Sequence, residues 1–386
     1  MGADRNVQRD PFIDFVRAGS LIVVVIWHWV FTILLWRPDG PHASNPIGFT
    51  HGLFLITWLF QVMPLFFFVG GHAHTVAWER TAGRRKASLG RFAATRVRQL
   101  LVPAFVLLGL WIALGFAVTW IEDVGWMWRA VKLVVSPLWF LAVYAFLVAL
   151  FPIAYRLHKR YGALVLVFQI GLAGVVDVIR FSHHVAWVGW FNMILVWGLC
   201  HQLGFFYADL KDRPRRWHAM LAWSGLFALF GLVYSGLYPG SMVGVPGDRF
   251  SNMAPPTLCI AALVMFQAGV ALLVRPWVLH RLTTRRRWAR FNTLVNRFSM
   301  PLFLFHTTGM AMSRAVGWLI LHRIGSRRPD LGWWFTRPVS WIGPMLWTLP
   351  VIWLFSRTPL GRPRPHGGSR PAGPDDQDRS TNQATA

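Results

Sequence analysis

Charged residues are few in this chain, at 14% of 386 residues, and only 15 are Asp or Glu. This composition does not suit a soluble domain, which needs more charge on its surface. Cysteine is also rare. Cys200 and Cys259 are too few for a disulfide framework or a cysteine metal site, and we expect them at different membrane depths, too far apart to bond. A phosphate-binding glycine loop is absent, which argues against an ATP-driven pump.

Long apolar runs are what the chain has instead. Hydrophobic residues make up 55% of it, and its mean hydropathy is +0.43. Runs of about 20 apolar residues are long enough to cross a membrane as helices. We therefore predict an all-α integral membrane protein, a bundle of about ten transmembrane helices near residues 12–36, 52–78, 99–120, 134–154, 162–179, 186–207, 217–238, 255–275, 298–321 and 334–355.

Basic residues gather in the loops that follow the even-numbered helices. Of the 39 Lys and Arg, 21 lie in four loops, residues 79–98, 155–161, 208–216 and 275–297. Cytoplasmic loops carry such an excess, so both termini are predicted to be cytoplasmic. The net charge of +24 is spread over short clusters beside the membrane, which favours the lipid bilayer and anionic cytosolic substrates as partners, and not nucleic acid.

The chain divides into three predicted parts. Residues 1–11 form a cytoplasmic N-terminus, residues 12–356 the transmembrane domain, and residues 357–386 a disordered cytoplasmic tail rich in Pro, Gly and polar residues. The first apolar run is too long for a signal peptide and should stay as an anchor. Because the loops are short, any chemistry must take place within the bundle.

Arg17 and His28 give the best indication of function. They lie eleven residues apart in the first apolar run, so a helix carries both on one stripe, about 16 Å apart in depth. The guanidinium is then expected near one membrane face and the imidazole near the middle of the hydrocarbon layer. A charge at that depth costs about 2.5 to 3.5 kcal/mol, so such residues usually serve a function.

The chemistry of this pair suits proton transfer. Neutral imidazole accepts a proton from a hydroxyl, as a general base must. Asp14 precedes Arg17 by three residues, close enough to pair with it or to orient it. The alternative is that Arg17 extends to the membrane surface and that His28 only bonds a neighbouring helix.

The second apolar segment holds two more histidines. Pro64 predicts a kink there, and Gly70 and Gly71 permit close approach of another helix. His72 and His74 lie two residues apart, so on a helix they point about 160° apart and cannot bind one ion together. We expect both at the interface near the cytoplasmic exit.

Three arginines and a further histidine complete the candidates. Arg96 and Arg98 lie where the basic loop is predicted to enter the membrane, and arginine binds phosphate through paired hydrogen bonds; the alternative is that they only set the topology. His306 lies about eight residues into the ninth helix, near the depth of His28, which suggests one polar cavity. Arg314, further along that helix, either serves a function or anchors the helix at the surface.

Five segments follow one another in a characteristic order: FIDFVRAGSLIVVVIWHW, PLFFFVGG, TRVRQLLVP, PLWFLAVY and RFSMPLFLFH. Together they resemble acyltransferase family 3, a family of integral membrane proteins, over about residues 10–356. Three positions depart from the family pattern. Gly70 stands where Ser is usual, and His72 stands where a bulky apolar residue is usual. Phe305 lies next to the closing His, where Trp or another residue is common. These departures bear on the acceptor more than on the reaction.

The resemblance implies an enzyme that transfers acyl groups, commonly acetyl, from cytosolic acyl-CoA to hydroxyl groups of carbohydrates and related acceptors of the cell envelope. Acyl-CoA is then the donor substrate, the acceptor is a carbohydrate or is linked to a lipid, and no bound cofactor or metal is implied. Arg17 and His28 take the positions of the family's essential pair.

The combined hypothesis is a multi-pass acyltransferase of the plasma or inner membrane. The alternative is a transporter or flippase in which Arg17 and the histidines relay a proton or an anion, without consuming acyl-CoA. The site residues of the enzyme hypothesis are His28, Arg17 and Asp14 for catalysis, and Arg96, Arg98, His306, Trp139 and His72 for substrate binding.

Overall fold

The protein is a helical bundle with one two-stranded hairpin among the residues that its computed structural model describes, which are 10–50, 52–82, 87–122, 124–246, 248, 250–321 and 329–361. The all-α class is confirmed. The principal helices are α1 (Pro11–Phe31), α3 (Met63–Ala82), α4 (Leu89–Ile121), α5 (Met127–Val135), α6 (Leu138–Tyr161), α7 (Leu164–Ser182), α8 (Asn192–Phe205), α10 (Arg215–Tyr234), α11 (Leu258–Thr284), α12 (Arg286–Arg297), α13 (Ser299–Leu321) and α15 (Ile342–Arg357).

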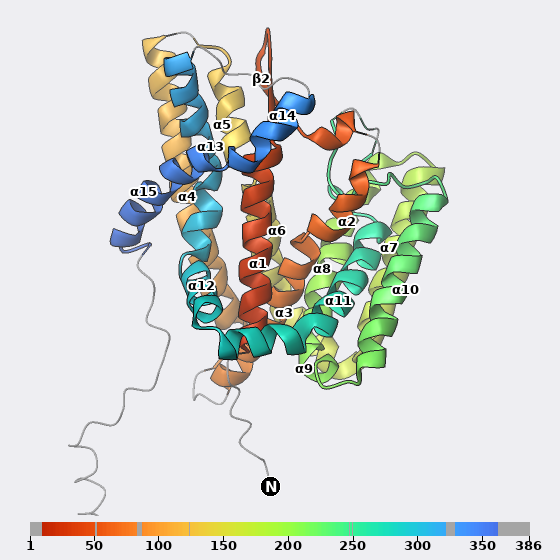
Figure 1. Ribbon diagram of the computed structural model, residues 1–386. Helices are drawn as coiled ribbons and strands as arrows, with labels where there is room; N and C mark the ends of the chain where they lie inside the picture. Colours follow the sequence, from red (N-terminus) through yellow and green to blue (C-terminus); the bar gives the residue numbers. More distant parts are fainter. Residues whose placement is uncertain are drawn as a thin grey trace, which may run out of the picture.

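Figure 1 shows α1 near the centre of the bundle, with α4, α12, α13 and α15 on one side and α7, α10 and α11 on the other. Short elements join these helices. The connecting elements are the strands β1 (Ile33–Arg37) and β2 (Gly40–Ser44), the helices α2 (Thr57–Phe60), α9 (Tyr207–Leu210) and α14 (Leu331–Thr336), and the 3-10 turns η1 (Pro46–Phe49), η2 (Leu53–Ile56), η3 (Ala186–Phe191) and η4 (Arg337–Val339).

Eight stretches of the described chain are long and apolar enough to cross a membrane, which makes this a multi-pass membrane protein. The two other predicted segments are helical as well. However, α8 has only 14 residues, and α13, with 23, carries His306 and Arg314 among its apolar residues. The count of ten crossings and the side of the termini stay predictions. The predicted terminal segments fall mostly on residues 1–9 and 362–386, which lie outside the described residues.

The first helix begins where expected but ends early. The Asp10 side chain accepts a hydrogen bond from the Phe12 nitrogen at 2.9 Å and caps α1, and Pro11 suits the first helical position. The helix was predicted to continue to residue 36, but Thr32 is extended and leads into the β1–β2 hairpin. Pro38 and Asp39 make its turn, and Gly40 follows them at φ 112° as the first residue of β2; a Pro-Asp-Gly run is a turn signal that the hydropathy pattern concealed.

The kink predicted at Pro64 is a complete break. Helix α2 ends at Phe60, Gln61 has a non-helical backbone, and α3 begins at Met63, directly before the proline. The carbonyl oxygens of Trp58 and Gln61 at the break accept hydrogen bonds from Gln267 Nε2, at 3.1 and 3.0 Å. A polar side chain from α11 thus replaces the lost helical bonds, as an irregular backbone within a membrane requires.

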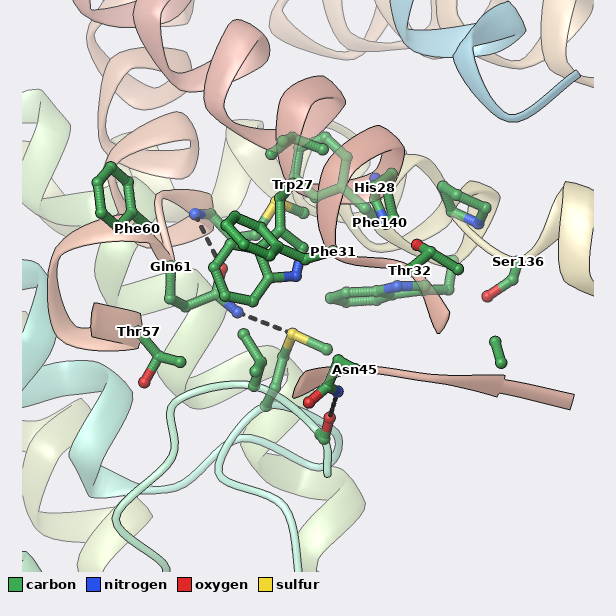
Figure 2. A pocket seen from close by; sticks show the side chains of 18 of the residues that line it. Trp27, His28, Phe31, Thr32, Asn45, Thr57, Phe60, Gln61, Ser136 and Phe140 are labelled. Carbon is green, nitrogen blue, oxygen red and sulfur yellow. Dashed lines mark hydrogen bonds between the residues drawn. The ribbon is translucent and has the colours of Figure 1, made fainter. Parts of the chain in front are cut away.

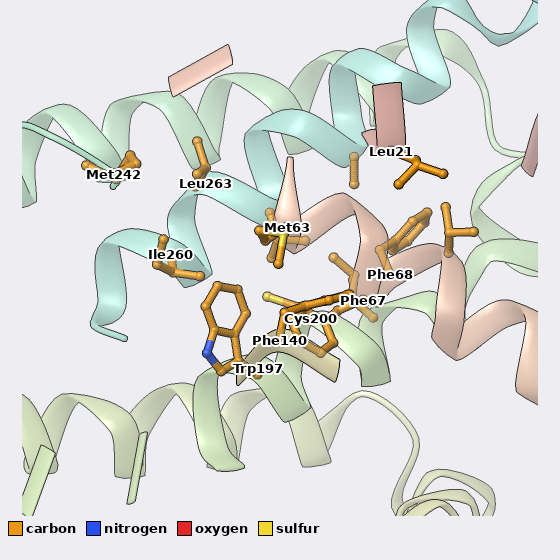
Figure 3. Close-up of a cluster of buried hydrophobic side chains, with 14 of the residues drawn as sticks. Leu21, Met63, Phe67, Phe68, Phe140, Trp197, Cys200, Met242, Ile260 and Leu263 are labelled. Atoms are coloured by element: carbon orange, nitrogen blue, oxygen red, sulfur yellow. The ribbon is translucent and has the colours of Figure 1, made fainter. Parts of the chain in front are cut away.

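Close helix packing surrounds the break. Helices α3 and α8 touch through Gly71 and Gly204: a Cβ at Gly204 would lie 2.9 Å from the His72 main-chain nitrogen. Small residues allow this approach, as the glycine pair in α3 predicted. The apolar core lies where these helices meet α1, α6 and α11; Figure 3 shows its side chains, among them Leu21, Met63, Phe67, Phe68, Phe140, Trp197 and Leu263.

The buried Asp177 holds the hairpin end of the bundle together, and by this end we mean the end from which the β1–β2 hairpin projects. Its carboxylate accepts hydrogen bonds from Asn192, Tyr238 and the Leu258 nitrogen, at 2.9, 3.1 and 2.9 Å. These bonds join α7 to the starts of α8 and α11. Burial, the largest effect, and the neighbouring Asp177 charge both raise the pKa of the Tyr238 hydroxyl, so it stays a donor.

Candidate active site

A cavity of about 320 Å³ lies at the hairpin end of α1, bounded by the α2–α3 break, the start of α6 and the loop that precedes α11. Figure 2 shows its side chains. Aromatic rings dominate the wall, and a few polar side chains lie among them, as in many small-molecule sites. The lining residues include Val24, Trp27, His28, Phe31, Thr32, Asn45, Thr57, Phe60, Gln61, Ser136, Trp139, Phe140, Met253 and Phe303.

His28 lies in this wall, in the last turn of α1. Its depth in the membrane stays a prediction, but its helix is shorter than expected, because α1 ends at Phe31 and not at residue 36. The cavity sits at the end of the helix because the hairpin and the broken α2–α3 stretch enclose that end. His28 remains about three helical turns from Arg17 along α1.

His28 bonds to His306, as their expected common depth suggested. The His28 Nδ1 and His306 Nε2 atoms are 3.1 Å apart, and His306 Nδ1 lies 2.6 Å from the Phe303 carbonyl oxygen. A carbonyl only accepts, so we assign the proton of neutral His306 to Nδ1. His306 Nε2 then accepts from His28 Nδ1–H, which leaves the lone pair of His28 on Nε2. The His28 ring also hydrogen-bonds the main-chain carbonyl of Val24, one turn earlier in α1; because a carbonyl only accepts, we assign this contact to Nδ1–H as well.

His306 is held firmly in place. It is fully buried, and its main-chain oxygen accepts a hydrogen bond of 2.8 Å from the Trp29 indole nitrogen. The next residue, Thr307, donates to the Val134 carbonyl oxygen at 2.8 Å. These two bonds fix α13 against α1 and α5, so the orientation of the His28 ring follows from the packing of three helices.

The polar wall opposite comes from segments that the sequence reading did not single out. Gln61 donates to the Met242 carbonyl oxygen at 3.2 Å and to Met253 Sδ at 2.8 Å. Asn45 donates to the Gly244 carbonyl oxygen at 2.9 Å. Both amides thereby fasten the loop before α11 over the cavity (Figure 2). Trp139, a predicted substrate-binding residue, lies in the same cavity as His28.

Arg17 lies outside this cavity, at the other end of α1, which we call the basic end. Its Nε donates to Asn296 Oδ1 at 2.8 Å, and its Nη2 bonds Asp14 Oδ1 at 2.9 Å. The pairing with Asp14 is as predicted. Asn296 also donates to the Asp14 carbonyl oxygen at 2.9 Å, which ties α12 to α1. The described cavity ends at Val24, so it does not join the two members of the pair into one open passage.

Arg96 and Arg98 do not form a joint site. Helix α4 begins at Leu89, well before the expected entry at residue 99, so both arginines are helical and point about 160° apart. Arg96 stacks over the Phe92 ring at 5.4 Å and acts electrostatically, with Arg17, on Tyr144. Arg98 is exposed on the opposite face of α4. The two arginines therefore cannot bind one phosphate together.

Tyr144 explains the departure at Gly70. A Cβ at Gly70 would lie 2.6 Å from the Tyr144 hydroxyl oxygen, so a serine would collide with this ring. The Tyr144 ring also packs against the His74 ring in a tilted arrangement, with ring centroids 5.6 Å apart. The larger aromatic side chain thus occupies the place of the usual serine.

His72 and His74 take different places. His72 packs on the ring of Tyr207 at the basic end, with centroids 4.6 Å apart. His74 is buried, and its Nδ1 lies 3.1 Å from His201 Nε2; its position near the membrane interface stays a prediction. The close α3–α8 contact at Gly71 draws this face of α3 into the bundle, and His74 serves the packing of α3 on α8.

Tyr207 belongs to a polar cluster at the start of α1. Its hydroxyl donates to Asp10 Oδ2 at 2.7 Å and accepts from Arg275 Nε at 3.0 Å. Burial raises the pKa of Asp10, but the bonds from Tyr207 and the Phe12 nitrogen and the charge of Arg275 outweigh it, so the pKa falls below its usual value. Asp10 therefore stays ionised and fastens α1 to α9 and α11.

The remaining expectations concern the cysteines and Arg314. Cys200 and Cys259 are buried and form no disulfide, as predicted. Arg314 lines a second cavity near the hairpin end, between α5, α13 and the hairpin. It is half-buried there, and the structure does not place it beside His28.

Comparison with known proteins identifies a family. A family model described as an acyltransferase domain matches residues 10–357, nearly the whole chain. No curated protein and no solved structure matches. The segments that carry the motifs quoted above all fall inside the matched range.

Proposed function

The chain belongs to this acyltransferase family and is an acyltransferase enzyme, and on that basis we propose that it transfers an acyl group, acetyl above all, from cytosolic acyl-CoA to a hydroxyl of a carbohydrate acceptor in the cell membrane. The observation that carries the proposal is the open Nε2 of His28 in an aromatic-lined cavity. Family membership favours this reaction over transport by a proton or anion relay.

The reaction follows from the tautomer of His28. Nε2 removes the proton of the acceptor hydroxyl while the hydroxyl oxygen attacks the thioester carbonyl carbon. The C–S bond then breaks, the acyl group stays on the acceptor oxygen as an ester, and the CoA sulfur leaves with the proton that Nε2 returns. General-base help of this kind contributes about 10² to 10⁴ in rate.

His306 supports both halves of this exchange as a positioning residue. Its Nε2 accepts from His28 Nδ1–H before the reaction and faces the same N–H when His28 is a cation. The carbonyl of Phe303 fixes the tautomer of His306 in turn. Both the Phe303 carbonyl and His306 belong to α13, so this helix sets the tautomer of His28. His28 therefore presents the lone pair of Nε2 to the substrate.

Aromatic rings and amides suit a sugar. Trp27, Trp139 and Phe140 offer flat apolar faces, and Gln61 and Asn45 offer amide groups beside them. A sugar has apolar C–H faces and hydroxyl edges, so this wall favours a carbohydrate over a purely apolar acceptor. The cavity volume of about 320 Å³ lies at the lower end of the usual range for ligand sites.

The donor is expected to arrive from the basic end. The charges of Arg17 and Arg96 both act electrostatically on the Tyr144 hydroxyl, so the two arginines lie near one side chain. Arginine suits the phosphates of CoA. The distance from Arg17 to His28 along α1, about 16 Å, fits a long, thin donor arm. Since the cavity ends at Val24, side chains between the two ends must move when the donor binds.

His28→Ala tests the proposal directly. Purified protein is given acetyl-CoA and a membrane extract as the source of acceptor, and the free thiol released is measured. We expect the variant to release thiol at least about 100-fold more slowly, since the base is lost.

The matched control is His183→Ala, an exposed histidine in the loop after α7, which should keep the wild-type rate. Wild-type turnover by His28→Ala would refute the assigned base. Solute uptake without any thiol release from the unaltered protein would favour the transporter alternative.

A further inference from the structure

A second, larger cavity of about 670 Å³ opens near the hairpin end, and we call it the Arg314 groove. It lies between α5, the later half of α13 and the hairpin, three elements that Figure 1 shows together at that end. Its wall is almost entirely apolar, and Arg314 is the charged residue in it. The lining residues are Thr32, Leu34, Trp36, Pro41, Trp126, Ala130, Leu133, Val134, Met310, Ala311, Arg314, Ala315, Trp318 and Leu319.

The guanidinium of Arg314 has no hydrogen bond or ion pair within the described part of the chain. Charged groups within a membrane protein normally find a partner, because an unpaired charge among apolar side chains is costly. A neighbouring charge is also positive: Arg337 acts electrostatically on Arg314. A positive group in an apolar groove, with a second positive group close enough to affect it, favours an anion there.

Two acidic side chains at the hairpin end, Asp39 and Asp330, are already engaged. Asp39 accepts from His42 at 2.9 Å and pairs with Arg129. The bond to His42 is the largest effect on the pKa of Asp39 and lowers it, as does the Arg129 charge, so the carboxylate stays ionised in that pair. Asp330 caps α14 through the Trp333 nitrogen. Neither carboxylate is available to Arg314, which leaves room for an anion from outside the described chain.

Arg337 is fixed in place beside the groove. Its Nη1 donates to the Val30 carbonyl oxygen at 3.2 Å and its Nε to the Trp333 carbonyl oxygen at 3.1 Å. Its position next to the end of α1 is therefore part of the fold. Arginine binds phosphate, like carboxylate, through paired hydrogen bonds, and basic pockets between membrane helices bind lipid head groups.

The groove adjoins the active-site cavity. Thr32 lines both, and Val134, in the groove wall, accepts the hydrogen bond from Thr307, the residue after His306. We propose that the Arg314 groove binds a lipid-linked form of the acceptor, with the apolar chain along α13, the phosphate at Arg314 and the sugar directed past Thr32 toward His28. This inference rests on the acyl transfer proposed above and names the acceptor class.

Lipid binding is tested without any reaction. Undecaprenyl monophosphate is added to the purified protein in detergent, and native mass spectrometry measures the bound lipid. We expect Arg314→Gln to bind it about tenfold more weakly than the unaltered chain, since a charged contact is lost. Undecaprenol, which lacks the phosphate, should bind both proteins equally. Arg37→Gln, an exposed arginine of the hairpin, is the matched control and should bind as the unaltered chain does.

A second variant fills the groove and leaves the charge. Ala311→Phe is expected to reduce binding of both the phosphate lipid and undecaprenol. Equal binding of the phosphate lipid by the unaltered chain, Arg314→Gln and Ala311→Phe would overturn the inference. The inference would also fail if inorganic phosphate bound the protein without displacing the phosphate lipid. It would fail as well if the same spectra showed a dimer of the chain that binds no lipid.

Thiol release separates this inference from the proposed function. If acetyl-CoA turnover depends on His28 but lipid binding does not depend on Arg314, the groove assignment fails alone. If the phosphate lipid binds through Arg314 but no thiol is ever released, the proposed acyl transfer fails and the lipid site stands without it.

Discussion

At the scale of single residues, the orientation of one imidazole decides what the site can do. His28 carries a lone pair toward the cavity only because His306 accepts from its other ring nitrogen, and His306 can accept only because the Phe303 carbonyl holds its own proton. A lone buried histidine has no such preference between its tautomers. The pair therefore converts an ordinary core side chain into a directed base.

Substitution of His306 tests this chain of hydrogen bonds. His306→Leu removes the acceptor, so we expect kcat to fall by about 100-fold while KM for acetyl-CoA stays the same. His306→Gln keeps an acceptor oxygen of similar reach and should recover most of the loss. Steady-state kinetics of thiol release measure both values. A purely structural role would instead give equal losses in the two variants, and that result would contradict the positioning role.

The sequence predicted part of this site and missed the rest for a physical reason. Helical periodicity placed His28 and His306 at one depth, and they are in contact. Periodicity carries no information about Asn296, whose amide bonds Arg17 across 279 residues of sequence, nor about Gln61, which reaches the cavity because a helix breaks. Contacts between distant segments depend on packing, and apolar patterns do not encode them.

At the scale of elements, hydropathy located the helices better than it located their ends. Every predicted segment holds a helix, because apolar length is what the membrane demands. The ends follow local signals instead: a hairpin with a Pro-Asp-Gly turn follows the early end of α1, and a polar stretch rich in arginine extends α4 back to Leu89. The second of these differences places Arg96 and Arg98 on opposite faces of α4, while phosphate binding by either arginine stays a prediction.

The close contact between α3 and α8 is expected to contribute to the stability of the protein. Gly204→Ala places a Cβ against the α3 backbone, and such overpacking costs about 1 to 3 kcal/mol. We expect a lower midpoint of thermal unfolding in detergent. Gly231→Ala is the matched control, since a Cβ there meets nothing within 4 Å, and it should leave the midpoint unchanged or slightly raised. Equal midpoints for the two variants would show that the contact is looser than described.

At the scale of the whole molecule, the charged loops converge on one end of the bundle. Asp10, at the start of α1, contacts Tyr207 of α9 and Arg275 of α11. Glu79, near the end of α3, lies 3.7 Å from Lys159 near the end of α6. The four arginine- and lysine-rich loops that predict the cytoplasmic side are therefore brought to the same end of the fold, which also holds Arg17.

This arrangement predicts that the two ends of the bundle face opposite sides of the membrane. The natural cysteines are buried, so a cysteine placed on the surface can be labelled selectively. In intact cells, a membrane-impermeant maleimide should label Pro38→Cys, in the hairpin turn, and should label Arg285→Cys, at the start of α12, only after the membrane is opened. Both positions are exposed, so access to the reagent depends on the side alone. Labelling of Arg285→Cys in intact cells would reverse the orientation, and the donor would then have to reach His28 from the hairpin end.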